Sequence, residues 1–213
     1  MTALIIAIDG PAAAGKGTLA RRLAALYGLP HLDTGLLYRI TGRRVLDAGG
    51  NPGDVTAAET AARGIVPADF ARSDLRGPVA DEAASRVAAF PAVRAALLDY
   101  QRGFGSARGA VLDGRDIGTV IFPDATAKLF VTASSEARGD RRWRELRARG
   151  VDAKLELVTA EVRARDLADE ARAAAPLRPA ADALVLDTTE LDPEAAFARA
   201  LRLLSTVLPA LPR

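Results

Sequence analysis

The chain has 213 residues, of which 49% are apolar and 26% charged, and its net charge at pH 7 is +2. This composition is that of one globular domain, or one domain with an insert, and so small a charge does not favour nucleic acid as a partner. The lack of cysteine excludes disulfides and thiolate metal sites, and the single histidine excludes chemistry that needs a histidine pair. Nearly all basic residues are arginines, whose planar fork suits carboxylate and phosphate groups.

The N-terminal apolar run does not have the features of a targeting segment. Residues 3–8 are too few for a signal peptide, and Asp9 closes the run. No stretch approaches the roughly 18 apolar residues of a membrane span. We therefore expect a cytoplasmic protein with no membrane partner.

Strands and helices are expected to alternate along most of the chain. Short apolar runs bounded by turn residues predict buried strands at 3–9, 29–33, 109–114, 126–133 and 182–188. Apolar residues at helical spacing, with glycine and proline stops, predict helices at 18–28, 36–46, 134–150, 154–175 and 193–208. This alternation predicts an α/β fold with a doubly wound, parallel five-stranded sheet.

The middle of the chain lacks the strand pattern. From about residue 47 to 104 there are loops at 49–54 and 71–78 and short helical pieces, two of them in 79–90 and 91–100. We expect this segment to be a helical insert on the α/β core.

The stretch IDGPAAAGKGT, residues 8–18, follows the first buried strand and opens a helix. That context is the one a phosphate-binding P-loop needs, because glycines let backbone N–H groups turn inward and the helix N-terminus attracts anions. Gly10, Gly15 and Lys16 have P-loop spacing, with Lys16 available to phosphate oxygens. Gly17 stands where serine or threonine is usual and Thr18 follows one position later, which favours a variant P-loop.

P-loop proteins include GTPase switches, motors and small-molecule kinases, and further motifs are needed to distinguish these classes. The chain has neither an Asn-Lys-x-Asp guanine-reading motif nor a motor signature. Instead, arginines follow strands or share a helix face, where an acceptor phosphate could lie. There are three such groups: Arg39 after the second strand, Gly114-Arg115-Asp116 after the next, and Arg165, Asp169 and Arg172 on one helix. Each group also has a purely structural explanation, respectively a solvated helix residue, a turn and a surface salt bridge.

Several further residues have more than one interpretation. The arginine run of 138–149 is most often a solvated helix face, but it could also be a lid over ATP phosphates or, less readily, an RNA-binding surface. Ser85 and Arg94 read as surface residues on local grounds alone. His31 is expected to be a neutral packed or exposed residue rather than a ligand.

Five segments in order, IDGPAAAGKGTLA, HLDTGLLYR, ASRVAAFPAVR, LDGRDIGTVIFPDA and APLRPAADALVLDT, make the chain similar to bacterial cytidylate kinases. The resemblance runs from about Ala3 to Leu204. It implies a nucleoside-monophosphate kinase fold, with one kinase domain over 1–213, a core of about 1–46 and 105–213, a substrate-binding insert of about 47–104 and an arginine-bearing lid of about 145–170. It implies transfer of the ATP γ-phosphoryl group to CMP or dCMP with Mg²⁺ present.

The resemblance also implies roles for single residues. Residues Gly10, Pro11, Ala12, Ala13, Ala14, Gly15, Lys16, Gly17 and Thr18 would hold the ATP phosphates. Arg39, Arg115 and Arg172 would hold the acceptor phosphate and, with Lys16, act in catalysis. Ser85, Arg94 and Asp116 would read the cytosine edge, with Thr34 nearby. Arg165 and Asp169 would contact the sugar, and Asp113 would be a strand-end carboxylate that orders nearby arginines.

The chain departs from the usual family pattern at four places. Thr34 stands where serine is familiar, and Ala13 replaces a loop glycine, so its φ is expected to tolerate a Cβ. Ala168 and Glu170 stand in a part of the lid helix that is often richer in arginine, and the segment 67–78 is shorter than usual.

Two rival functions remain at this point. Another P-loop kinase, such as an adenylate or shikimate kinase, would share the loop and the arginines. A non-catalytic nucleotide- or RNA-binding protein would use the 138–149 run. For the cytidylate kinase interpretation we expect CMP and dCMP as small-molecule partners, no nucleic acid, no direct protein metal ligands and a monomer.

Overall fold

The computed structural model describes residues 3–106 and 108–208. It divides into two compact units: a core unit, up to Leu32 and again from Phe104, and an insert unit, Asp33–Gly103. The insert unit begins at α2 because α2 packs on α3 and α4. In the described part of the chain, no helix is both long and apolar enough to cross a membrane.

A five-stranded parallel sheet with strand order β2-β3-β1-β4-β5 confirms the expected fold class. In the register, Asp9 of β1 lies opposite Gly114 of β3 and Phe130 of β4. The carboxyl ends of these central strands therefore lie together, which is where open α/β sheets bind ligands. The strands are β1 (Ile5–Asp9), β2 (His31–Asp33), β3 (Ala110–Gly114), β4 (Ala127–Thr132) and β5 (Leu184–Asp187).

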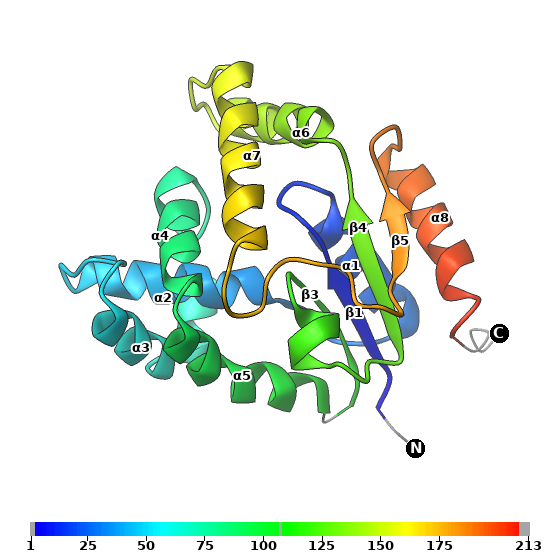
Figure 1. The fold of residues 1–213 in the computed structure, drawn as a ribbon, viewed down its shortest axis with the longest axis horizontal. Helices are drawn as coiled ribbons and strands as arrows, with labels where there is room; N and C mark the ends of the chain where they lie inside the picture. Colours follow the sequence, from blue (N-terminus) through cyan, green and yellow to red (C-terminus); the bar gives the residue numbers. More distant parts are fainter. Residues whose placement is uncertain (1–2, 107, 209–213) are drawn as a thin grey trace. The chain divides into compact units, whose positions relative to one another are not determined.

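One face of the sheet carries the main hydrophobic core. Alternate residues of β1, Ile6 and Ile8, are fully buried and belong to one cluster with Leu23 of α1 and Leu204 of α8. Burying side chains of this size stabilises the fold by roughly 1.5–3 kcal/mol each. Figure 1 shows the helices of the core unit around the sheet; they are α1 (Lys16–Tyr27), α6 (Ser135–Ala148), α7 (Leu155–Glu170) and α8 (Pro193–Leu204), with a π-helical turn η2 (Ile117–Ile121).

The insert unit is helical, as expected from its lack of strand pattern. Its buried side chains include Leu37 and Ile40 of α2 and Val87 of α4. The segment 67–78 forms a short 3-10 helix and turns, with no strand. The elements are α2 (Thr34–Asp47), α3 (Val55–Arg63), η1 (Pro67–Ala71), α4 (Pro78–Ala88) and α5 (Pro91–Ser106), which continues past the boundary of the unit.

The helix expected at 154–175 is shorter than its sequence suggests. It ends at Glu170, because the Leu177 N–H donates to the Asp169 carbonyl at 2.9 Å and turns the chain back. Ala175 adopts a positive φ of 53°, which a helix does not allow. Arg172 therefore lies in the turn after α7. The last helix likewise ends at Leu204 rather than at residue 208.

Candidate active site

The P-loop joins β1 to α1 at the carboxyl edge of the sheet. Gly15 precedes α1 with φ 89°, and the first turn of the helix carries no acidic residue, so its positive dipole end is available to an anion. The Lys16 side chain is buried and its Nζ donates to the Pro11 carbonyl at 2.7 Å. The lysine side chain therefore lies across the loop that is expected to bind the ATP phosphates.

Two loop positions have special backbone geometry. Gly10 has φ 145°, and a Cβ there would lie 1.9 Å from the Val131 carbonyl oxygen, so only glycine fits where the loop leaves β1 beside β4. Ala13 has φ 59°, in the left-handed region. This region is small but allowed for a residue with a Cβ, as expected for Ala13, and it costs an L-residue roughly 1–2 kcal/mol.

A buried carboxylate supports the loop that follows β3. Asp9, at the end of β1, accepts the N–H groups of Ile117 and Gly118 at 2.8 and 2.7 Å. Burial raises the pKa of Asp9 to about 6, although these hydrogen bonds and Lys16 lower it and Asp116 raises it. Asp9 thus ties the P-loop strand to η2. Sequence reasoning used this residue only as the end of an apolar run.

Asp169 brings together two of the arginines singled out in the sequence. It is fully buried, accepts from Arg115 Nε at 2.7 Å and accepts from an Arg172 N–H. Burial alone would raise the pKa of Asp169, but the charges of Arg115, Arg172 and Arg165 outweigh burial and hold the pKa below its ordinary value. The result is a compact positive cluster organised by one ionised carboxylate.

The carboxylates at the end of β3 have separate surroundings. Asp113 is buried, and its Oδ1 lies 2.7 Å from His31 Nε2 on β2. Nothing in the sequence indicated this carboxylate neighbour of His31, because the two residues are 82 positions apart. Asp113 also lies near the P-loop, because a Cβ on Gly17 would be 3.9 Å from its Oδ2. Asp116 is buried next to η2.

The insert unit holds the remaining candidate residues. Arg39 Nε donates to Asp81 Oδ1 of α4 at 2.9 Å, so this arginine is paired rather than a solvated helix residue. The Arg94 guanidinium lies 5.6 Å from the centre of the Tyr38 ring. Thr34 is buried at the first turn of α2, and Ser85 is half-buried on α4.

A cavity of about 210 Å³ opens beside the helix end of the P-loop. Its walls are largely apolar and its lining includes Gly15, Thr18, Arg141 and Thr188. The Arg141 guanidinium donates to the Thr188 hydroxyl at 3.0 Å and to the Thr188 carbonyl, while that hydroxyl lies 3.2 Å from the Ala14 carbonyl. Arg141 was expected only as one member of a charged run.

The arginine run of 138–149 is not a free basic face. Arg138 pairs with Asp166, Arg144 with Asp140, and both Arg142 and Arg149 with Glu145. Three carboxylates therefore pair with four of the six arginines in this run. Among residues 3–106 and 108–208, no group of three or more histidine or acidic side chains could hold a metal ion by itself.

Comparison with known proteins decides among the P-loop kinases. The family model described as cytidylate kinase matches residues 6–206. The chain belongs to the cytidylate kinase family. It is 66% identical to a cytidylate kinase of Granulibacter bethesdensis, covering 92% of this chain and 94% of that protein, and 59% identical to one of Acidiphilium cryptum, covering 96% and 97%.

Solved structures agree on the fold of this cytidylate kinase family member. An uncharacterized protein from Eubacterium ventriosum has a TM-score of 0.51 at 13% identity, covering 95% of this chain and 99% of its own. TT1252 from Thermus thermophilus has a TM-score of 0.50 at 24% identity, covering 99% and 100%. The fold and the family expected from the sequence are both confirmed.

Proposed function

We propose that this chain transfers the γ-phosphoryl group of ATP to CMP or dCMP, giving CDP or dCDP, by positioning and charge neutralisation. Cytidylate kinase activity follows from membership of the family. One observation supports the mechanism: within the core unit, an anion-binding P-loop and the Arg115–Asp169–Arg172 cluster are joined through Arg138, which contacts both Ala12 and α7.

The donor side of the proposal rests on the P-loop and the cavity beside it. Backbone N–H groups of residues 10–18 and the α1 N-terminus would receive the phosphates, and Lys16 would leave Pro11 for their oxygens. The cavity would take the adenine and ribose, because its apolar walls suit a base and Arg141 can stack on it.

The acceptor side rests on arginines in both units, each placed by its own unit. In the core unit, Arg115 and Arg172 would bind the acceptor phosphate, and Arg165 and Asp169 would contact the sugar. In the insert unit, Arg39 would bind the phosphate, and Ser85 and Arg94 would read the cytosine, with Thr34 nearby. Asp116 of the core unit would read the base as well. We further propose that residues 145–170 act as the lid.

Phosphoryl transfer in this site needs little from a general base. The transition state is loose, so positioning and stabilisation of negative charge do most of the work. Lys16, Arg115 and Arg172 can neutralise the two nucleotides, which otherwise repel each other. The arginine fork also sets geometry, since it binds phosphate oxygens in pairs.

Mg²⁺ fits this arrangement as an ion carried by the nucleotide. The Thr18 hydroxyl lines the cavity and the Asp113 carboxylate lies near Gly17, and these oxygens could hold a cation that keeps several of its waters and binds phosphates. When bound, it would supply charge neutralisation for the nucleotide phosphates.

A coupled assay with one nucleoside monophosphate at a time tests the proposal. ATP consumption should be stimulated strongly by CMP and dCMP and weakly by AMP; shikimate should have no effect. Comparable turnover of AMP would overturn the acceptor assignment. RNA binding that weakens steeply with salt, without turnover, would instead support the non-catalytic alternative. The ion pairs of arginines in 138–149 argue against that alternative.

A further inference from the structure

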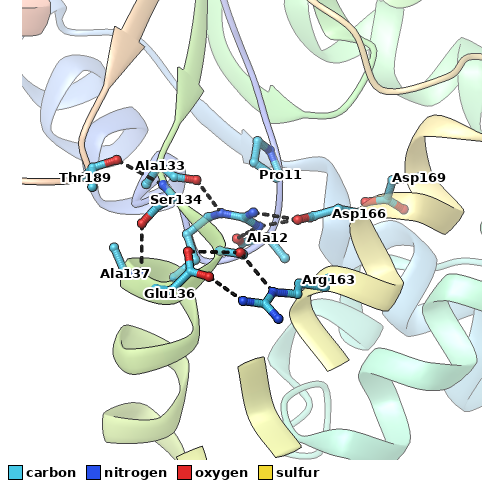
Figure 2. A network of polar contacts seen from close by, with 12 residues as sticks. Pro11, Ala12, Ala133, Ser134, Glu136, Ala137, Arg163, Asp166, Asp169 and Thr189 are labelled. Carbon is cyan, nitrogen blue, oxygen red and sulfur yellow. Dashed lines mark hydrogen bonds and ion pairs between the residues drawn. The ribbon is translucent and has the colours of Figure 1, made fainter. Parts of the chain in front are cut away.

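Arg138 departs most clearly from the expectation of a solvated arginine face. Its side chain is only 5% exposed. Nε donates to the Ala133 carbonyl at 2.8 Å, and Nη1 donates to the Ala12 carbonyl at 3.3 Å. Nη1 and Nη2 also form a fork on the two carboxylate oxygens of Asp166, at 2.9 and 2.5 Å. Figure 2 shows the three residues that these bonds join, Ala12 of the P-loop, Ala133 at the end of β4 and Asp166 of α7, close to one another.

The contact with Ala12 bears on the phosphate-binding face of the loop. In a trans peptide the C=O and the following N–H point in opposite directions. An arginine that holds the Ala12 carbonyl on its own side therefore directs the Ala13 N–H to the other side. Ala13 needs that hold, because its φ of 59° is unfavourable for alanine and persists only where surrounding contacts fix it.

The contact with Asp166 bears on the acceptor cluster. Asp166 lies three residues before Asp169 on α7, so the two carboxylates are neighbours one turn apart. Asp169 is the residue that holds Arg115 and Arg172. Helices α6 and α7 approach very closely beside Arg138, since a Cβ on Gly139 would lie 2.2 Å from Thr159 Oγ1. This close approach lets a residue of α6 reach α7 with its charge buried.

We infer that Arg138 is a positioning residue for the donor nucleotide. It sets the Ala12–Ala13 peptide so that the Ala13 N–H faces the donor phosphates. Through Asp166, it links that peptide to the helix that carries the acceptor cluster. The inference rests on the proposed function, because it takes ATP as the ligand of this loop.

The substitutions R138K and D166N test both halves of the inference. Lysine keeps the charge of Arg138, but its three donors on one nitrogen cannot replace the four hydrogen bonds of the planar guanidinium, two of which form the fork on Asp166. We expect R138K to weaken ADP binding about tenfold in titration calorimetry, and to raise KM for ATP similarly, while CMP affinity stays within about twofold. We expect D166N to weaken ADP binding by a smaller factor. The double variant should lose less than the product of the two single losses, because both act through one contact.

A matched control lies on the same two helices. Arg163 of α7 pairs with Glu136 of α6, but these side chains are 57% and 65% exposed. Substitution R163Q should leave ADP and CMP binding unchanged, because exposed pairs contribute little. Figure 2 shows Arg163 and Glu136 joined to each other, with Asp166 nearby on α7.

Three results would overturn the inference. The first is wild-type ADP affinity in R138K, and the second is an equal loss of ADP and CMP binding, which would indicate general loosening. The third is a D166N variant with wild-type ADP affinity and a double variant equal to R138K, which would indicate that Arg138 acts on the nucleotide without Asp166. If R138K does not fold, the ADP and CMP affinities of D166N decide the question. Failure of the wild-type protein to bind ADP at all would instead refute the proposed donor site.

Discussion

Two residues near the carboxyl edge of the sheet, Ala13 and Asp9, have a strained backbone and a buried carboxylate that the sequence does not reveal. Ala13 occupies a left-handed conformation, and Asp9 is a carboxylate buried behind the P-loop. Ala13 shapes the P-loop, and Asp9 holds η2 against β1, the strand that leads into the loop. Each has a measurable effect on stability.

Replacing Ala13 with glycine should stabilise the protein. Glycine removes the roughly 1–2 kcal/mol cost of the left-handed region, and its greater freedom in the unfolded chain returns part of this, leaving a gain of about 0.5–1 kcal/mol. Urea unfolding measures the change. The control A25G lies at an exposed position inside α1 and should destabilise by about 1 kcal/mol. A loss of stability in A13G would contradict the interpretation.

Stability should depend on pH through Asp9. Its pKa is about 6 in the folded protein and near 3.8 when unfolded, so the folded state holds the proton more tightly. Its contribution is then fully present below pH 3.8 and is lost as pH rises through 6, a change of about 3 kcal/mol. The difference in unfolding free energy between wild type and D9N should fall by about this amount between pH 3 and 7. A difference that is constant with pH would exclude a raised pKa.

Among the elements, α7 and the turn after it matter most to the candidate chemistry. The helix presents Asp166 to Arg138 and Asp169 to Arg115, and it stops at Glu170 so that Arg172 can fold back onto Asp169. One helix therefore supplies partners to both proposed sides of the reaction.

Removing Arg115 should abolish most of the activity without unfolding the protein. We expect R115A to lower kcat about 10²- to 10³-fold, by analogy with the loss of one preorganised donor in a water-excluded site. Steady-state kinetics with CMP, together with circular dichroism for the fold, measures this. The control R63A removes an exposed ion pair with Glu59 on α3 and should retain full activity. Wild-type turnover in R115A would remove Arg115 from the catalytic assignment.

Elements that depend on local pattern were predictable from the sequence, and features that depend on distant partners were not. The strands β1 and β3 could be predicted from their continuous apolar runs, because parallel strands are buried on both faces. The glycine loop could be predicted from its spacing between a strand and a helix. The end of α7 could not, because residues 171–175 are good helix formers and only tertiary contacts turn them. Arg138 was missed for a similar reason, since its burial depends on Asp166, 28 residues away.

On the scale of the whole molecule, the two compact units divide the candidate residues. The core unit holds the P-loop and the Asp169 cluster, while the insert unit holds Arg39, Ser85 and Arg94. The proposal therefore assigns ATP to the core unit alone and draws on the insert unit only for the acceptor. The borders of substrate-binding insert and lid, and the monomeric state, stay predictions; light scattering on the purified protein tests the last.

Substitutions in the insert unit should accordingly affect only the acceptor. We expect R94A to raise KM for CMP at least tenfold while KM for ATP changes less than twofold, because Arg94 loses its proposed contact with cytosine. The control R86A lies nearby on α4 in an exposed pair with Glu82 and should change neither constant. An equal rise in both constants would contradict the division.

The fully buried Asp169 has a consequence for an enzyme that works among millimolar salts. Two guanidinium groups left alone would attract any small anion of the cell, such as sulfate or inorganic phosphate. Because Asp169 already occupies one side of each, a visiting anion gains little unless other parts of the same molecule are also held. Under the proposed acceptor assignment, we expect the resting protein to bind such ions weakly and to retain a nucleotide that is held at several points.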